Sequence, residues 1–293
     1  MSKGFIQDLG NDVEMHGSLP RLVVKHRTAS GEMFLHGSHI TSWCPTGCEE
    51  VLYLSPRSQF SPGAAIRGGV PICFPWFGPH VQDASLPTHG FARTLPWEPV
   101  EHLSREDGVT IHTRLRSNAN SEGRGNQFVI DYHVTFGPKL RMRFIINNVG
   151  KQGFDFELAL HAYLAVSDVR NIRVGGLEGV EYVDKADGMR RKRQSEQWLN
   201  LEGETDRVYM GVESGCVVED TGWARRILVE KSNSRSTVIW NPCETKAEQL
   251  KDLGAENWRG FVCVEPGNVG ENKVHLEPGG RHEMAATIGV EGM

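Results

Sequence analysis

The sequence alternates between apolar and polar residues over long stretches, as in strands with one buried face. Over residues 128–136 the even positions are Phe, Ile, Tyr, Val and Phe, whereas Asp131, His133 and Thr135 occupy odd positions. Residues 137–139, Gly-Pro-Lys, have the composition of a turn, and alternation resumes over 140–146. The two runs therefore predict a β-hairpin.

Strand signals of this kind recur along most of the chain, and glycine and proline clusters interrupt them at short intervals. The further predicted strands are 21–25, 33–43, 51–54, 109–115, 154–166, 226–230, 237–240, 261–265 and 284–290. Many short strands with few helical patterns predict an all-β fold, a large antiparallel β-sandwich with a few short helices.

One helix is expected after Thr245, because Thr245 and Glu248 have the spacing of a capping box and Gly254 is a plausible stop. Residues 185–206 are polar and lack period-2 order, so we interpret them as a long excursion with one helical turn. The basic run 190–193 lies there, and a solvated loop explains it better than a nucleic-acid patch, because no aromatic stacking platform accompanies it. No linker divides the chain, so residues 1–293 are expected to form one domain.

Composition excludes several classes of protein. With 39% hydrophobic residues the 293-residue chain can bury a core, and its net charge of −5 gives no general attraction to nucleic acid or anionic lipid. Any bound anion must therefore be held by a local basic cluster. No signal peptide or membrane span is expected, and Cys44 and Cys48 lack a second cysteine pair that would complete a zinc site. We expect a cytoplasmic monomer without a metal.

Two residues are candidates for acid–base chemistry. The even positions of 154–166 are apolar, so His161 should point to the opposite face, together with Asp155, Glu157 and Tyr163. It is either a histidine on a solvated face or a proton donor near neutral pH. Glu265 ends the apolar run 261–265, which places its carboxylate either at the rim of a sheet or in a site.

Arg67 and Arg93 are candidate anion ligands because each lies near glycines, which leave backbone amides open. Arginine near glycine is also common without any ligand. Neither a P-loop nor a Gly-x-Gly-x-x-Gly fingerprint is present, so the usual nucleotide sites are unsupported. The segment 71–78 is rich in aromatic residues and proline, and would either plug the end of the sandwich or stack on a sugar ring.

Taken together, these segments resemble the glucose-6-phosphate 1-epimerase branch of the galactose mutarotase-like (aldose 1-epimerase) superfamily. The matching motifs occur in family order and cover roughly residues 20 to 290. They are Ile-Arg-Gly-Gly-Val-Pro-Ile-Cys-Phe-Pro-Trp-Phe-Gly at 66–78, His-Gly-Phe-Ala-Arg at 89–93, Leu-His-Ala-Tyr at 160–163, Thr-Asp-Arg-Val-Tyr at 205–209, Trp-Asn-Pro at 240–242 with Lys-Ala at 246–247, and Val-Cys-Val-Glu-Pro-Gly-Asn at 262–268.

The resemblance implies a galactose mutarotase-like supersandwich with a cleft on its concave face and neither metal nor organic cofactor. It also implies a role for each matching residue: Glu265 as general base, His161 as general acid, Arg67 and Arg93 as phosphate or substrate ligands, Gln82 and Asp206 as ligands of sugar hydroxyls, and His89 in support. Cys243 stands where many relatives have an aromatic residue.

The chemistry implied is interconversion of the α and β anomers of a hexose 6-phosphate, with glucose 6-phosphate as the expected substrate. An ionised Glu265 would take the C1 hydroxyl proton while a protonated His161 donates to the ring oxygen, and the fold must bring the two together. Two alternatives stay open. One is an epimerase of unphosphorylated hexoses, and the other is a sugar-phosphate-binding protein without catalysis.

Overall fold

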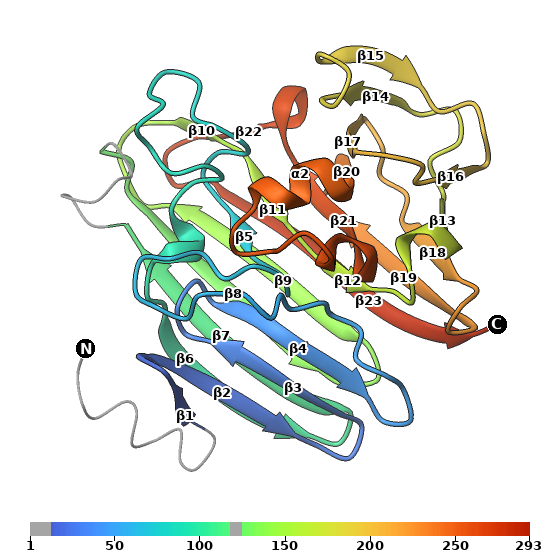
Figure 1. The fold of residues 1–293 in the computed structure, drawn as a ribbon. Helices are drawn as coiled ribbons and strands as arrows, with labels where there is room; N and C mark the ends of the chain where they lie inside the picture. Colours follow the sequence, from blue (N-terminus) through green and yellow to red (C-terminus); the bar gives the residue numbers. More distant parts are fainter. Residues whose placement is uncertain (1–12, 118–124) are drawn as a thin grey trace.

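The computed structural model describes residues 13–117 and 125–293 (Figure 1). Within these residues, strands form sheets of four, nine, eight and two strands, and every pairing between named strands is antiparallel. The four-stranded sheet has the order β1 Val13–His16, β2 Leu19–Lys25, β3 Ala29–Phe34, β4 His39–Pro45. The nine-stranded sheet has the order β16 Trp198–Asn200, β13 Ile172–Gly175, β18 Cys216–Asp220, β19 Arg225–Ser232, β23 Arg281–Gly292, β9 Leu140–Asn148, β8 Phe128–Phe136, β7 Gly108–Arg116, β6 Glu98–Arg105.

The remaining strands form an eight-stranded and a two-stranded sheet. The eight-stranded sheet has the order β15 Arg190–Arg193, β14 Glu181–Asp184, β17 Thr205–Met210, β20 Ser236–Asn241, β21 Phe261–Asn268, β11 Leu158–Leu160, β5 Ile72–Cys73, with β12 Tyr163–Ala165 also paired to β21. The two-stranded sheet joins β10 Phe154–Phe156 to β22 Val274–Leu276. The helices of the described residues are α2 Cys243–Gln249 and the short 3₁₀ turns η2 Ala92–Thr94, η3 Val169–Asn171, η4 Asn257–Gly260 and η5 Gly270–Asn272.

The sheets form two facing layers. Isolated bridges join Ile40 on β4 to Val70, which precedes β5, and Leu52, which follows β4, to Leu164 on β12. In Figure 1 the four-stranded sheet lies over β6–β9 of the nine-stranded sheet. Trp43 on β4 donates a hydrogen bond of 3.0 Å to the carbonyl of Gly137 in the β8–β9 turn. Apolar residues from both layers form one buried core between them.

The predicted hairpin is confirmed. β8 pairs with β9 from Phe128 opposite Asn148 to Phe136 opposite Leu140. Along β8 the burial alternates without a break, and the even positions are the buried ones. The period-2 pattern thus identified the buried face of β8, and a shift of one residue in the pairing would turn this apolar face to solvent.

Three predicted strands differ from the structure. The run 154–166 consists of β10, β11 and β12, because the chain leaves the β21 ladder at His161, whose N–H donates to the carbonyl of Pro71. The run 33–43 divides into β3 and β4 around a turn. Residues 51–54 make only isolated bridges. In each case the chain makes backbone hydrogen bonds to segments that are distant in sequence, and a local pattern does not register these.

The helix prediction is partly wrong. Helix α2 begins at Cys243, two residues before Thr245, so the expected capping box does not form. Its first turn is held instead by Asn241, whose side-chain oxygen accepts from the Cys243 N–H at 2.9 Å. The helix ends at Gln249, before the expected stop at Gly254. No described helix is long and apolar enough to cross a membrane.

The interpretation of 185–206 as a polar excursion is wrong, because this segment contains β15 and β16. The basic run Arg190–Arg193 is β15, at the edge of the eight-stranded sheet, and is not a solvated loop. Its cations have acidic partners: Arg190 pairs with Asp187, Arg191 with Glu271, Lys192 with Asp184 and Arg193 with Glu181. Charged residues on an edge strand oppose pairing with another chain.

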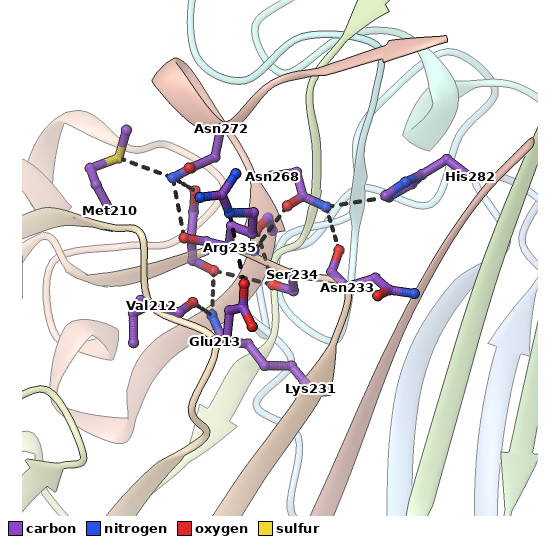
Figure 2. Close-up of polar contacts among 12 residues, drawn as sticks. Met210, Val212, Glu213, Lys231, Asn233, Ser234, Arg235, Asn268, Asn272 and His282 are labelled. Carbon is purple, nitrogen blue, oxygen red and sulfur yellow. Dashed lines mark hydrogen bonds and ion pairs between the residues drawn. The ribbon is translucent and has the colours of Figure 1, made fainter.

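The end of β21 is fixed by a network of amide side chains (Figure 2). Asn268, the last residue of β21, donates to the carbonyl of Asn233 at 2.8 Å and accepts from the Arg235 N–H at 2.9 Å. Asn272 donates to the carbonyl of Arg235 and to the Ser236 hydroxyl, at 3.1 and 3.0 Å. These bonds secure β21 against β20 three residues beyond Glu265.

Candidate active site

A cavity of about 430 Å³ opens over the eight-stranded sheet. Strands, loops and α2 all contribute to its wall. Its lining residues are Arg67, Phe77, Gly78, Pro79, Thr88, His89, Arg93, His161, Lys185, Asp206, Val238, Trp240, Lys246, Leu250 and Glu265. Six of the seven residues singled out in the sequence are therefore in one place.

The register of β21 brings His161 and Glu265 together. Ala159 on β11 pairs with Gly267, and Tyr163 on β12 pairs with Cys263, so His161 lies between them, opposite Glu265. The Nε2 atom of His161 is 3.3 Å from Oε1 of Glu265. Their side chains are 8% and 1% exposed. The sequence expectation that the fold joins these two residues is confirmed, whereas the solvated-face reading of His161 is wrong.

Neither group of the pair has its hydrogen-bonding capacity filled. Among the described residues, both carboxylate oxygens of Glu265 and Nδ1 of His161 are buried without a hydrogen-bond partner, and the 3.3 Å contact lacks hydrogen-bond geometry. Buried polar atoms without partners are rare in folded proteins and costly. Their concentration here is typical of groups that bind a ligand.

Burial controls the ionisation of the pair. Burial raises the pKa of Glu265 well above its usual value, and the nearby Asp206 carboxylate raises it further. Burial lowers the pKa of His161 well below its usual value, and the positive charge of Arg93 lowers it further. Burial therefore favours the neutral form of each group. It opposes the expected starting state, an ionised Glu265 beside a protonated His161.

Aromatic rings hold the imidazole of His161 in place. The ring of Tyr163 stacks on it, with centroids 4.8 Å apart and an angle of 14° between the planes. The rings of His89 and Trp240 approach edge-on, with centroids at 5.6 and 5.8 Å. The imidazole can therefore change its protonation without changing its position.

The two candidate arginines differ in their partners. Arg67 donates through Nε and Nη2 to both oxygens of Asp252, at 3.0 and 3.2 Å, and through Nη1 to the Tyr163 hydroxyl at 2.9 Å. Arg93 donates to the carbonyl of Thr88 at 2.6 Å. No acidic residue in the described chain forms an ion pair with Arg93, so its charge is available to an anion.

His89 lies in the left-handed region with φ of 66°. Its Nδ1 accepts from the Gly78 N–H at 3.1 Å, which leaves Nε2 to carry the proton. Burial lowers the pKa of His89 well below its usual value, and Arg93 and His161 lower it further. His89 is thus a neutral donor in the cavity wall.

Asp206 on β17 lies opposite Trp240 on β20 and faces the cavity. Its carboxylate is 3.5 Å from the ammonium of Lys185. Burial raises the pKa of Asp206, while Lys185 lowers it. Sequence reasoning assigned no role to Lys185, and it mentioned Lys246 only within a motif. Both lysines line the cavity.

Gln82 is the candidate that the structure does not bring to this cavity. It lies on an exposed loop and lines a neighbouring cavity with Trp76, His80 and Phe156. Pro79 contributes to both cavities, so the loop that carries Gln82 forms the wall between them. Its expected contact with a sugar hydroxyl stays a prediction.

A metal could in principle be held by His161, Cys263 and Glu265, whose candidate ligand atoms lie within 4.8 Å of one another. The chemistry of these donors is unfavourable, however. Burial raises the pKa of Cys263 well above its usual value, which disfavours the thiolate that a zinc ligand must be. Arg93 also lines this cavity and would repel a dication.

Comparisons with known proteins agree with this geometry. A model of the aldose 1-epimerase family matches residues 20–288. A protein of Salmonella typhimurium described as a "putative glucose-6-phosphate 1-epimerase" is 36% identical over 247 residues, which are 84% of this chain and 82% of that protein. A protein of Cenchrus ciliaris with the same description is 32% identical over 278 residues, covering 91% and 83% of the two chains.

Solved structures agree with the fold. The crystal structure of a "putative mutarotase" from Salmonella typhimurium superposes with a TM-score of 0.90 at 32% identity, and the match covers 96% of this chain and 93% of that one. A galactose mutarotase-like protein from Clostridium acetobutylicum has a TM-score of 0.74 at 13% identity, over 96% and 98% of the chains. The expected all-β, mutarotase-like sandwich is confirmed.

Proposed function

The chain belongs to the aldose 1-epimerase family, and from this premise we propose that its cavity interconverts the α and β anomers of glucose 6-phosphate. The observation that carries the proposal is the His161–Glu265 contact of 3.3 Å. The pair is buried, has unfilled hydrogen-bonding capacity and lies in a cavity lined with cations. Anomer exchange requires one proton acceptor and one proton donor on either side of C1, and this pair supplies both.

Glu265 acts as the base and His161 as the acid. The C1 hydroxyl of the sugar donates to a Glu265 oxygen, and a hydrogen bond to the charged form of a carboxylate lowers its pKa. A proton held by Glu265 then moves to His161, whose Nε2 lies 3.3 Å from Oε1, as sugar binding brings the two groups into hydrogen-bond geometry. In this state Glu265 can accept a proton, and His161 can donate one to the ring oxygen.

The reaction conserves protons and electrons. Glu265 takes the C1 hydroxyl proton, His161 gives a proton to the ring oxygen, the bond between C1 and that oxygen breaks, and an aldehyde forms. Rotation about the C1–C2 bond presents the other face of the aldehyde. Ring closure then returns both protons by the reverse transfers, so the two residues end in their starting states.

The cations of the cavity favour a phosphorylated substrate. Arg93 has no ion-pair partner in the described chain, and Arg67, Lys185 and Lys246 lie in the same wall. Phosphate contacts remote from C1 raise turnover only to the extent that they enforce the reactive geometry. An epimerase of unphosphorylated hexoses would use the same acid–base pair without needing these charges.

The proposal is tested by exchange NMR of the anomeric protons, with glucose 6-phosphate and glucose measured at equal concentration and with the uncatalysed rates subtracted. We expect faster exchange for glucose 6-phosphate. A larger acceleration for glucose would favour the unphosphorylated substrate, and saturable binding without any acceleration would establish a binding protein. We also still predict that the protein is a cytoplasmic monomer, that it uses no cofactor, and that it binds neither nucleic acid nor membranes.

A further inference from the structure

Lys185 and Asp206 face each other across two neighbouring strands at the cavity. Lys185 follows the last residue of β14, and its N–H donates to the carbonyl of Asp206 on β17 at 2.8 Å. Their side chains meet in the cavity, where the ammonium is 3.5 Å from a carboxylate oxygen. The ammonium also lies 5.2 Å from the centre of the Phe77 ring.

The distance between the charged groups of Lys185 and Asp206 is longer than in neighbouring ion pairs. Lys192 is 2.8 Å from Asp184 on the same sheet, and Lys246 is 2.5 Å from Glu204. Arg67 binds both oxygens of Asp252. Lys185 therefore combines a position in the cavity with a comparatively weak hold on its partner. A lysine side chain is also long and flexible, so its charge can move several ångströms without any change in the backbone.

The Lys185–Asp206 ion pair competes with the binding of sugar hydroxyls to Asp206, and a phosphorylated sugar can remove this competition. Asp206 is suited to accept hydrogen bonds from sugar hydroxyls, yet its charge is directed at Lys185. A sugar phosphate brings hydroxyl donors for the carboxylate and a dianion for the ammonium. An unphosphorylated sugar brings only the hydroxyls, so it must compete with Lys185 for Asp206.

We propose that Lys185 determines specificity for the phosphorylated substrate. The phosphate of the substrate binds the Lys185 ammonium in place of Asp206, and the Asp206 carboxylate is then free to bind a sugar hydroxyl. This inference rests on the proposed function and adds a residue and a switching contact to it. Lys185 lowers the pKa of both His161 and Glu265, which is consistent with an ammonium within electrostatic range of the reacting atoms.

The test is calorimetric binding of glucose 6-phosphate and of glucose to wild type, Lys185→Met and Lys185→Arg. For Lys185→Met we expect about 10- to 100-fold weaker binding of glucose 6-phosphate, the loss typical of a hydrogen bond to a charged group. Binding of glucose should be unchanged or tighter, since Asp206 is released. Lys185→Arg should keep most of the affinity for glucose 6-phosphate.

Lys192→Met is the matched control, because it removes another lysine paired with an aspartate on the same sheet but outside the cavity lining. It should change neither affinity. The inference is overturned if Lys185→Met binds glucose 6-phosphate as tightly as wild type, or if it loses both sugars equally. If wild type and Lys185→Met differ as expected but wild type accelerates no anomer exchange, the proposed function fails while the specificity role stands.

Discussion

The Nε2 atom of His161 lies 3.3 Å from Oε1 of Glu265, in a place where both side chains are almost completely buried. The antiparallel register of β21 with β11 and β12 makes the two residues neighbours. Burial favours the neutral form of each group, because it raises the pKa of Glu265 and lowers the pKa of His161. A site of this kind can give one proton and take another without any net change.

The first prediction concerns stability at alkaline pH. The raised pKa of Glu265 means that the folded state must keep a proton which the unfolded chain loses above its reference pKa of about 4.3. The contribution of Glu265 to the free energy of unfolding is therefore fully present below that value, and it is lost as pH rises toward the pKa of Glu265 in the folded state. Glu265→Gln removes this loss.

Above about pH 7.5 the histidine of the unfolded chain is also largely neutral. There the free energy of unfolding of Glu265→Gln should rise relative to that of wild type by up to about 1.4 kcal/mol per pH unit, as long as Glu265 stays protonated in the folded protein. Urea unfolding at several pH values from about 7.5 to 9 measures the difference. A difference that does not change with pH over this range would show that Glu265 is ionised in the folded protein.

The second prediction separates phosphate binding from sugar binding. Arg93→Ala removes a cation of the cavity that has no ion-pair partner among the described residues. The KM for glucose 6-phosphate should rise by roughly 10- to 100-fold, as for loss of a charge-assisted hydrogen bond, whereas exchange of glucose should change little. Equal losses on both sugars would mean that Arg93 does not act through a phosphate.

The third prediction concerns Asp252, which lies outside the cavity lining and holds the guanidinium of Arg67 with two hydrogen bonds. Asp252→Asn leaves Arg67 less well oriented, so the KM for glucose 6-phosphate should rise about tenfold. The maximal rate should fall much less, and Asp252→Glu should recover part of the loss. Steady-state kinetics on the three proteins would contradict this role if KM stayed at the wild-type value.

The fourth prediction tests the core. The hydroxyl of Tyr132 is buried without a hydrogen-bond partner in the described chain, whereas the buried hydroxyl of Tyr209 donates to Gln194 at 3.0 Å. Tyr132→Phe should leave the unfolding free energy unchanged or raise it by up to about 1 kcal/mol, because an unsatisfied polar group is removed. Tyr209→Phe should lower it by about 1 kcal/mol. Chemical denaturation of both variants measures the two free energies of unfolding. A decrease in Tyr132→Phe as large as that in Tyr209→Phe would show that the Tyr132 hydroxyl is hydrogen-bonded.

Local patterns predicted the fold where one face of a strand is buried and the other is not. Strands β8 and β9 meet this condition, and the turn between them lies at the predicted residues 137–139. The pattern failed after Leu158, because every residue from there to Val166 is buried, whichever face it occupies. Alternation then no longer indicates which way a side chain points.

The candidate site was predictable only in part for a related reason. His161 and Glu265 were singled out because each is a titratable residue within an apolar run, and family resemblance supplied their roles. Lys185 and Asp252 gave no such signal, since each acts through a partner that is distant in sequence. Gln82 was assigned by the resemblance alone, and it lies in a loop that lines a neighbouring cavity, so its contact with the sugar stays a prediction.

The most direct measurement is exchange NMR of the anomeric protons of glucose 6-phosphate with wild type, His161→Gln and Glu265→Gln, each shown to be folded by circular dichroism. Wild type should accelerate exchange, and each variant should lose at least about 100-fold, the usual contribution of a general acid or base. Near wild-type exchange in either variant would contradict the role of that residue. No acceleration by the wild-type protein would contradict the proposed activity itself.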